Sequence, residues 1–140
     1  MIEEEKAGGH SVFDPIPPEC ERVGKEIIGA AIEVHRHLGR GLLESVYEKA
    51  LVHELRLRKL IVRQQVLVPV FYKDLRIDGQ RLDLLVEPGV IAEVKAVERL
   101  IDAHAAQILS YLRSTKLRLG YLINFNTPVV SRGGIKRFVN

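Results

Sequence analysis

The sequence predicts an α/β fold in which a mixed β-sheet is flanked by helices. Three observations predict it. Apolar residues recur at helical spacing in the first third of the chain, and nearly continuous apolar runs follow. One more segment with helical spacing lies between the earlier apolar runs and the last two. Of the 140 residues, 46% are hydrophobic and 28% are charged, which excludes a collagen-like, low-complexity or fully disordered chain. At roughly 100–200 residues per domain, this length predicts a single domain.

Three amphipathic helices are expected. Residues 23–38 and about 42–59 place apolar side chains at helical spacing, and the glycines Gly39 and Gly41 end the first of these helices. The short connection makes the two helices an antiparallel pair. The helical spacing returns over residues 102–115, where Asp102 is the expected N-cap.

The remaining ordered segments are expected to be strands. Pro69 lies inside the first apolar run and predicts an edge position or a bulge, and Asp78-Gly79 predicts a turn. The next two runs are so continuously apolar that both faces of their strands should be buried. The expected strands cover residues 62–72, 81–86, 90–97, 117–125 and 135–139.

Residues 1–22 are predicted to be a disordered or loosely draped tail, and residues 23–140 to form the single domain. The tail contains three consecutive glutamates, a Gly8-Gly9 pair and closely spaced prolines. No stretch approaches the ~18 apolar residues of a membrane helix, and the N-terminus lacks the pattern of a secretory signal. With Cys20 as its one cysteine, the chain has no internal disulfide, so a cytoplasmic location is expected.

The charge is unevenly distributed. The net charge is +3, but residues 1–22 hold six acids and two bases, which leaves 19 bases and 12 acids in residues 23–140. After Asp102 there are six Lys or Arg residues and no acid. Such a basic half favours a polyanionic partner, most simply nucleic acid. The alternative, a mildly basic domain without any such partner, stays open on charge alone.

Three charged residues lie inside the expected buried strands. Asp83 interrupts residues 81–86, and Glu93 and Lys95 interrupt residues 90–97 on one strand face. Buried charges are costly unless they are paired or hold an ion. Two carboxylates on adjacent strands offer the oxygen ligands that Mg²⁺ prefers. A structural ion pair, Glu93 with Lys95 or Asp83 with Arg81, is the other interpretation.

Further polar side chains fall on the half-apolar faces of the expected helices. Glu44 lies one turn before Tyr47, and His104, Gln107 and Tyr111 follow one another at helical spacing. Together with the strand carboxylates they place polar groups on several elements facing the core. Such a concentration of polar side chains on core-facing positions favours a functional site over unrelated ion pairs.

The position of Pro88 predicts the pairing of the two central strands. A two-residue loop would need a positive φ at Pro88, whose ring holds φ near −65°, so the loop should be Glu87-Pro88-Gly89. This loop pairs Val86 with Val90, and it places Asp83 opposite Glu93. The same register extends to Leu84 with Ala92, Leu82 with Val94 and Arg81 with Lys95. A local bulge could bring the two carboxylates together by another route.

These residues resemble the PD-(D/E)XK nuclease superfamily. Asp83 followed by Glu93-Val94-Lys95 matches its signature, although Leu82 stands where the name-giving proline would be. The stretch Gly41-Leu42-Leu43-Glu44-Ser45-Val46-Tyr47 is similar to the motif of its GxxExxY family, and Gln107 with Tyr111 to the QxxxY motif of its RecB-type branch. The resemblance covers about residues 26–139 and implies a restriction-endonuclease-like core.

The resemblance also implies roles for individual residues. Asp83 and Glu93 would be the principal ligands of Mg²⁺ or Mn²⁺, with Glu44 as an additional acid in metal binding and catalysis. Lys95 would be the catalytic lysine and Gln107 would support it. The expected substrate-binding residues are Tyr111, His104, Arg81 and Arg113.

The predicted function is therefore a metal-dependent nuclease that hydrolyses phosphodiester bonds of nucleic acid, with DNA preferred over RNA. Two alternatives stay open: a catalytically silent nucleic-acid-binding module, and an oligomeric interaction protein with the same fold. No membrane partner is expected. In a domain this short, target choice would come from loops, a partner or a homodimer.

Overall fold

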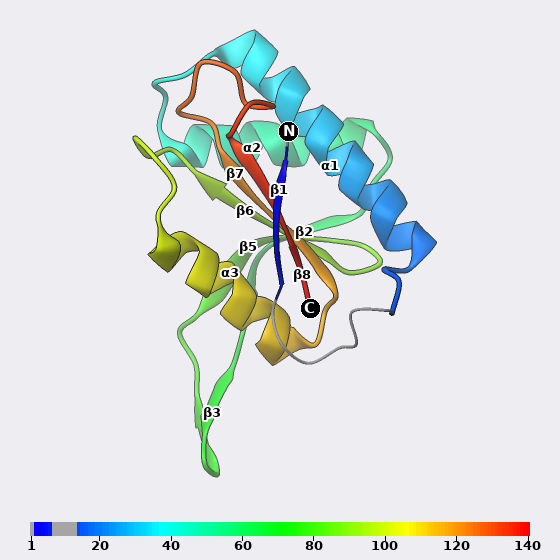
Figure 1. Cartoon of the computed structure of the whole chain (residues 1–140), viewed down its shortest axis with the longest axis vertical. Helices are drawn as coiled ribbons and strands as arrows, with labels where there is room; N and C mark the ends of the chain where they lie inside the picture. Colours follow the sequence, from blue (N-terminus) through cyan, green and yellow to red (C-terminus); the bar gives the residue numbers. More distant parts are fainter. Residues whose placement is uncertain (1, 7–13) are drawn as a thin grey trace.

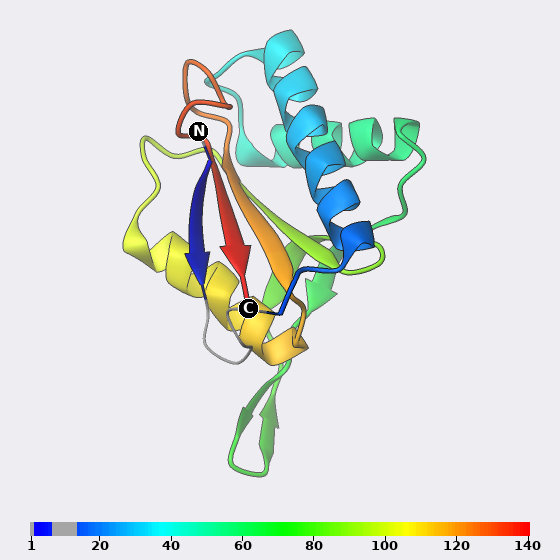
Figure 2. The same ribbon diagram turned by 45° about the vertical axis from the view of Figure 1, so that its right-hand side comes forward.

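A computed structural model describes residues 2–6 and 14–140, in which a six-stranded sheet has helices on both faces. The strand order is β1-β8-β7-β6-β5-β2, with β1–β8 and β6–β7 parallel and the other neighbours antiparallel. Figures 1 and 2 show α1 and α2 on one side of this sheet and α3 on the other. The predicted mixed sheet flanked by helices is confirmed. The elements are β1 (Glu3–Lys6), α1 (Pro18–Leu38), α2 (Glu44–Leu57), β2 (Val62–Leu67), β3 (Val70–Tyr72), β4 (Leu75–Ile77), β5 (Arg81–Val86), β6 (Val90–Lys95), α3 (Asp102–Thr115), β7 (Leu119–Asn124) and β8 (Ile135–Val139).

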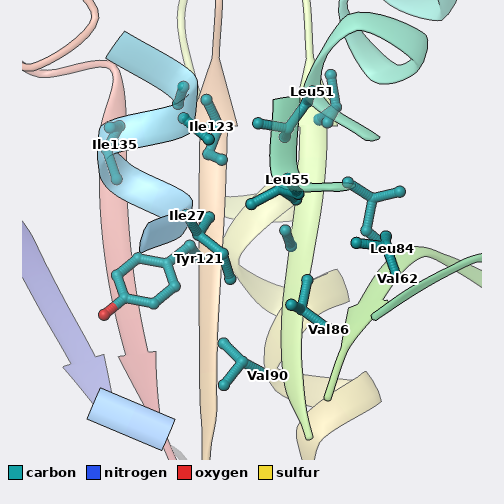
Figure 3. Packing of buried hydrophobic residues seen from close by; sticks show 14 of the residues in the cluster. Ile27, Leu51, Leu55, Val62, Leu84, Val86, Val90, Tyr121, Ile123 and Ile135 are labelled. Carbon is teal, nitrogen blue, oxygen red and sulfur yellow. The ribbon is translucent and has the colours of Figure 1, made fainter. Parts of the chain in front are cut away.

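The sheet separates two hydrophobic clusters, as the period of two along a strand requires. On β6, Val90, Ala92 and Val94 pack with α1 and α2, while Ile91 packs with α3. Figure 3 shows the first cluster, where Ile27 of α1 and Leu51 and Leu55 of α2 lie against strand side chains. Both faces of β6 and β7 are thus covered, as their apolar runs predict.

The predicted tail over residues 1–22 is wrong for two of its parts. The stretch Glu3–Lys6 forms β1 beside β8, and α1 begins at Pro18 rather than at Val23. Proline is well tolerated in the first helical turn because its missing N–H would have no partner there. Of the remaining tail residues, 1 and 7–13 lie outside the described residues, and residues 14–17 form no helix or strand.

The segment predicted as one strand over residues 62–72 is two strands separated at Pro69. The first, β2, is one of the two edge strands of the sheet, as the proline predicts. The second, β3, forms a hairpin with β4, a strand that the sequence analysis did not predict. This hairpin projects from the body of the molecule (Figures 1 and 2).

At α3 the predicted bounds hold, but the N-cap is Ile101 and not Asp102.

The register between β5 and β6 is confirmed as far as Leu84. Val86 pairs with Val90 and Leu84 with Ala92 around the loop Glu87-Pro88-Gly89, whose first peptide bond is cis. Beyond Leu84 the ladder stops, so the predicted pairs of Leu82 with Val94 and of Arg81 with Lys95 are wrong. Leu82 packs in the cluster under α3, whereas Leu84 and Val94 pack in the cluster under α1 and α2.

Candidate functional site

Asp83 and Glu93 lie where the ladder between β5 and β6 is interrupted. The Asp83 backbone N–H donates to Glu93 Oε1 at 2.7 Å, and the Val94 N–H donates to Asp83 Oδ2 at 2.9 Å. Each carboxylate therefore takes the place of a backbone carbonyl of the opposite strand. The two side chains meet in this gap by means of a local irregularity rather than by regular cross-strand pairing.

The environment of Glu93 disfavours its negative charge. Its side chain is only 2% exposed. Burial and then the negative charge of Asp83 raise the pKa of Glu93 to about 9, although the hydrogen bond from the Asp83 backbone and the charge of Lys95 oppose the shift. A cation held between the two carboxylates would remove this repulsion, and perturbed carboxyl groups of this kind cluster at functional sites.

Lys95, Gln107 and Tyr111 form a connected group on the α3 side of the gap. Lys95 Nζ donates to Gln107 Oε1 at 3.1 Å, and the Gln107 side chain also lies beside the buried Tyr111 hydroxyl. Burial and the charges of Glu93 and Asp83 raise the pKa of Tyr111, so its hydroxyl keeps its proton at neutral pH. The predicted neighbourhood of Lys95, Gln107 and Tyr111 is thus present, with Gln107 fixing the position of the ammonium group.

His104 and Glu44 lie at the outer rim of this group. The Ile101 N–H donates to His104 Nδ1 at 3.1 Å, so the neutral ring carries its proton on Nε2. Burial and the charge of Lys95 lower the pKa of His104, while Glu44 opposes the shift. Glu44 is exposed at the start of α2, and its Oε1 accepts a hydrogen bond from the Ala96 N–H at 3.3 Å.

The sequence analysis missed two polar residues beside Asp83. Gln65 Nε2 donates to Asp83 Oδ1 at 3.2 Å and to Glu48 Oε1 at 3.1 Å, which joins β2, β5 and α2. Burial and then the charge of Asp83 raise the pKa of Glu48. Glu48 lies one helical turn after Glu44, and this i,i+4 spacing is the signal that could have revealed it.

In the described residues, two predicted substrate-binding residues, Arg81 and Arg113, form no hydrogen bond or ion pair with Asp83 or Glu93. Arg81 is exposed and donates to the Gln65 carbonyl at 3.4 Å. Arg113 is exposed on α3, two residues after Tyr111 and therefore ~200° around the helix axis, on the side away from Gln107.

Asp83 and Glu93 are the two carboxylates that meet at this site. Within residues 2–6 and 14–140, no group of three or more His, Cys, Asp or Glu side chains is arranged to hold a metal ion. Asp83 and Glu93 nevertheless fit a hard divalent cation such as Mg²⁺, because this ion is commonly held by one or two carboxylates with water and substrate phosphates as its other ligands.

Comparison with known proteins agrees with this arrangement. No curated protein and no solved structure gave a significant match to the chain. A family model of the PD-(D/E)XK nuclease superfamily matches residues 21–138, which includes the acid pair, Lys95 and α3. The mixed sheet with flanking helices is accordingly a restriction-endonuclease-like fold, and nucleases of this superfamily generally use divalent metals. Since the match spans most of its length, the chain belongs to the PD-(D/E)XK nuclease superfamily.

Proposed function

We propose that this protein is a metal-dependent nuclease that cleaves phosphodiester bonds of DNA at the gap between β5 and β6. The observation that carries the proposal is the meeting of Asp83 and Glu93 in an interrupted ladder, with the charge on buried Glu93 disfavoured. A purely structural ion pair would place a cationic side chain between the carboxylates. Here the Lys95 ammonium group instead donates to Gln107.

Asp83 and Glu93 are the proposed ligands of Mg²⁺ or Mn²⁺. The bound ion would polarise the phosphate and lower the pKa of a water molecule. Both carboxylates are held in place by backbone N–H groups of the neighbouring strand, so little reorganisation is needed for them to hold a cation. Gln65 orients Asp83 from the β2 side through its remaining oxygen.

Lys95 is the proposed catalytic cation. Its ammonium group is held by Gln107, and it lies close enough to Glu93 for its charge to act on that carboxyl group. From this position the ammonium group can orient a water molecule or stabilise the charge that develops on the phosphate oxygens. Tyr111 and the Nε2–H of His104 are two further donors on the α3 side, and both are proposed to bind the substrate strand.

Divalent-metal titrations with plasmid and single-stranded DNA test this proposal. Because it removes a group that stabilises transition-state charge, Lys95→Ala should lower the cleavage rate by about 10²- to 10³-fold. The matched control is Lys25→Ala, which removes an exposed lysine of α1 on the other face of the sheet. Metal-independent cleavage, or equal rates for the two variants, would contradict the nuclease proposal. DNA binding without turnover would favour the catalytically silent module.

A second comparison decides which acid of α2 supports metal binding by Asp83 and Glu93. Glu48 is joined to Asp83 through Gln65, whereas Glu44 is bound to the Ala96 backbone. Glu48→Gln should therefore weaken Mn²⁺ binding by about tenfold, as expected when a neighbour of a metal ligand is lost. Glu44→Gln should change it by less, and titration calorimetry measures both. A larger effect at Glu44 would assign the role as the GxxExxY resemblance implies.

Three finer points stay predictions. These are membership of the GxxExxY family, DNA rather than RNA as the substrate, and a homodimer. The DNA and RNA arms of the cleavage assay address the second, and sedimentation analysis of the purified chain addresses the third. None of the described helices is long and apolar enough to cross a membrane.

A further inference from the structure

A basic pocket lies beside the proposed catalytic site and takes no part in it. Its volume is about 340 Å³, and its lining includes Arg40, Arg99, Arg132 and Lys136, with Glu98 as the one acid. This size exceeds that of a single phosphate group and falls in the range of small-ligand pockets. The pocket combines room for a nucleotide with a surplus of cationic groups.

The register of the sheet places this pocket close to the acid pair. Leu122 of β7 pairs with Glu93 on one side and with Lys136 of β8 on the other. Lys136 therefore lies two strands from Glu93, or about 10 Å across the sheet. Asn124, which lines the pocket, pairs with Lys95 of β6, and because pairing partners point to the same face of a sheet, the pocket lies next to Lys95.

The walls of the pocket are held together by a buried amide. Asn124 Oδ1 accepts a hydrogen bond from the Val97 N–H at 3.1 Å, and Asn124 Nδ2 donates to the Val97 carbonyl at 3.0 Å. These bonds tie the segment that follows β6 to the end of β7. The Asn124 N–H also donates to the Gly134 carbonyl at 2.7 Å, which closes the loop carrying Arg132. The segments that carry Arg99 and Arg132 are thus preorganised.

Three of the cationic side chains are available to a ligand. In the part of the chain that the structure describes, the side chains of Arg40, Arg99 and Arg132 form no hydrogen bond and no ion pair, whereas Lys136 already has an interaction partner. A guanidinium group presents a planar set of donors that matches the oxygens of a phosphate. Unpaired arginines in a preformed cavity are therefore suited to a phosphorylated ligand.

We propose that this pocket binds a phosphate of the nucleic-acid strand next to the phosphate that is cleaved, through Arg99 and Arg132. The inference rests on the proposed function, which supplies the strand. The phosphate is either an internal one of the backbone or a terminal one. In both cases the pocket fixes the distance between the bound phosphate and the acid pair.

Binding of single-stranded DNA in the presence of EDTA tests the proposal without cleavage. The substrates carry a 5′-phosphate, a 3′-phosphate or hydroxyl groups at both ends. For the double variant Arg99→Gln/Arg132→Gln we expect affinity to fall by roughly 10- to 100-fold, because two charge-assisted contacts are lost. The slope of log K against log salt should fall by about 0.7 for each phosphate no longer neutralised.

The matched control is Arg22→Gln, an exposed arginine near the Glu87–Gly89 turn at the other end of β5 and β6. Equal losses for all substrates would identify an internal phosphate, and a loss confined to one end-phosphorylated substrate would identify a terminal one. Wild-type affinity and a wild-type salt slope in a double variant with an unchanged melting temperature would overturn the proposal that the pocket binds a phosphate.

Should the double variant fail to fold, Arg99→Lys/Arg132→Lys keeps the charges and should still weaken binding. Wild-type affinity in that variant would equally overturn the pocket.

The two proposals can fail separately. If the double variant loses binding but no variant or wild-type protein cleaves DNA, the pocket stands as a phosphate-binding site for nucleic acid, while the nuclease proposal fails. If cleavage requires Lys95 while binding ignores Arg99 and Arg132, the nuclease proposal stands and the pocket fails.

Discussion

Replacing Asp83 by asparagine is expected to reduce metal-dependent cleavage by roughly 10³-fold or more. The reason is that a metal ligand contributes several kcal/mol of transition-state stabilisation, and each ~1.4 kcal/mol corresponds to a factor of ten in rate. The asparagine oxygen can still accept the Val94 N–H, so the interrupted ladder should survive. Cleavage rates and the heats of Mn²⁺ binding measure the effect.

Asp74→Asn is the matched control, because Asp74 lies in the exposed turn between β3 and β4. It should cleave and bind metal like the wild type. An Asp83→Asn protein with wild-type heats of Mn²⁺ binding would remove Asp83 from the metal site, whatever its cleavage rate.

The second large effect is a dependence of metal-free stability on pH. Glu93 has a pKa of about 9 in the folded protein against 4.5 as its ordinary value. Between these values the unfolded chain has released the proton that the folded protein still holds. The free energy of unfolding in EDTA should therefore fall as the pH rises through this window, by up to ~1.4 kcal/mol per pH unit and by several kcal/mol in all.

Glu93→Gln isolates this contribution, because glutamine keeps an acceptor for the Asp83 N–H and cannot ionise. Urea unfolding at pH 5.5, 7 and 8.5 should show the variant gaining stability relative to the wild type as the pH rises. Mg²⁺ at pH 8.5 should stabilise the wild type and not the variant. Glu19→Gln, a change at an exposed helix residue, should follow the wild-type curve. Parallel curves for wild type and Glu93→Gln would show that Glu93 does not hold a proton in the folded state.

The elements that depend on contacts between residues close in sequence could be predicted from the sequence. Helical spacing revealed α2 and α3 to within two residues at each end, and Pro88 was enough to predict the turn between β5 and β6. The ladder could be followed only as far as Leu84, since the argument assumed a strict alternation of faces. At Asp83 side chains replace backbone partners, and neighbouring side chains change faces. No periodicity argument contains that information.

Contacts between remote segments could not be predicted. An acidic segment such as Glu3–Lys6 is a poor strand by itself, but Glu4 Oε2 accepts a hydrogen bond from Arg137 at 2.8 Å across the parallel pair with β8. The partner is more than 130 residues away, so local composition indicated a tail. Glu48 was missed for the same reason, because its link to Asp83 passes through Gln65 on a third element.

The irregular conformation of Gln65 also affects how copies of this protein meet one another. Edge strands offer unpaired backbone groups on which another chain can polymerise, and β2 is such an edge. Gln65 has a φ of 51° and drops out of the ladder with β5, and Pro69 follows shortly after the strand. An incoming strand would find only Val62–Gln64 in regular conformation before the template ends. The irregular backbone that brings Gln65 to Asp83 therefore also leaves the β2 edge poorly suited to pair with a strand of another copy.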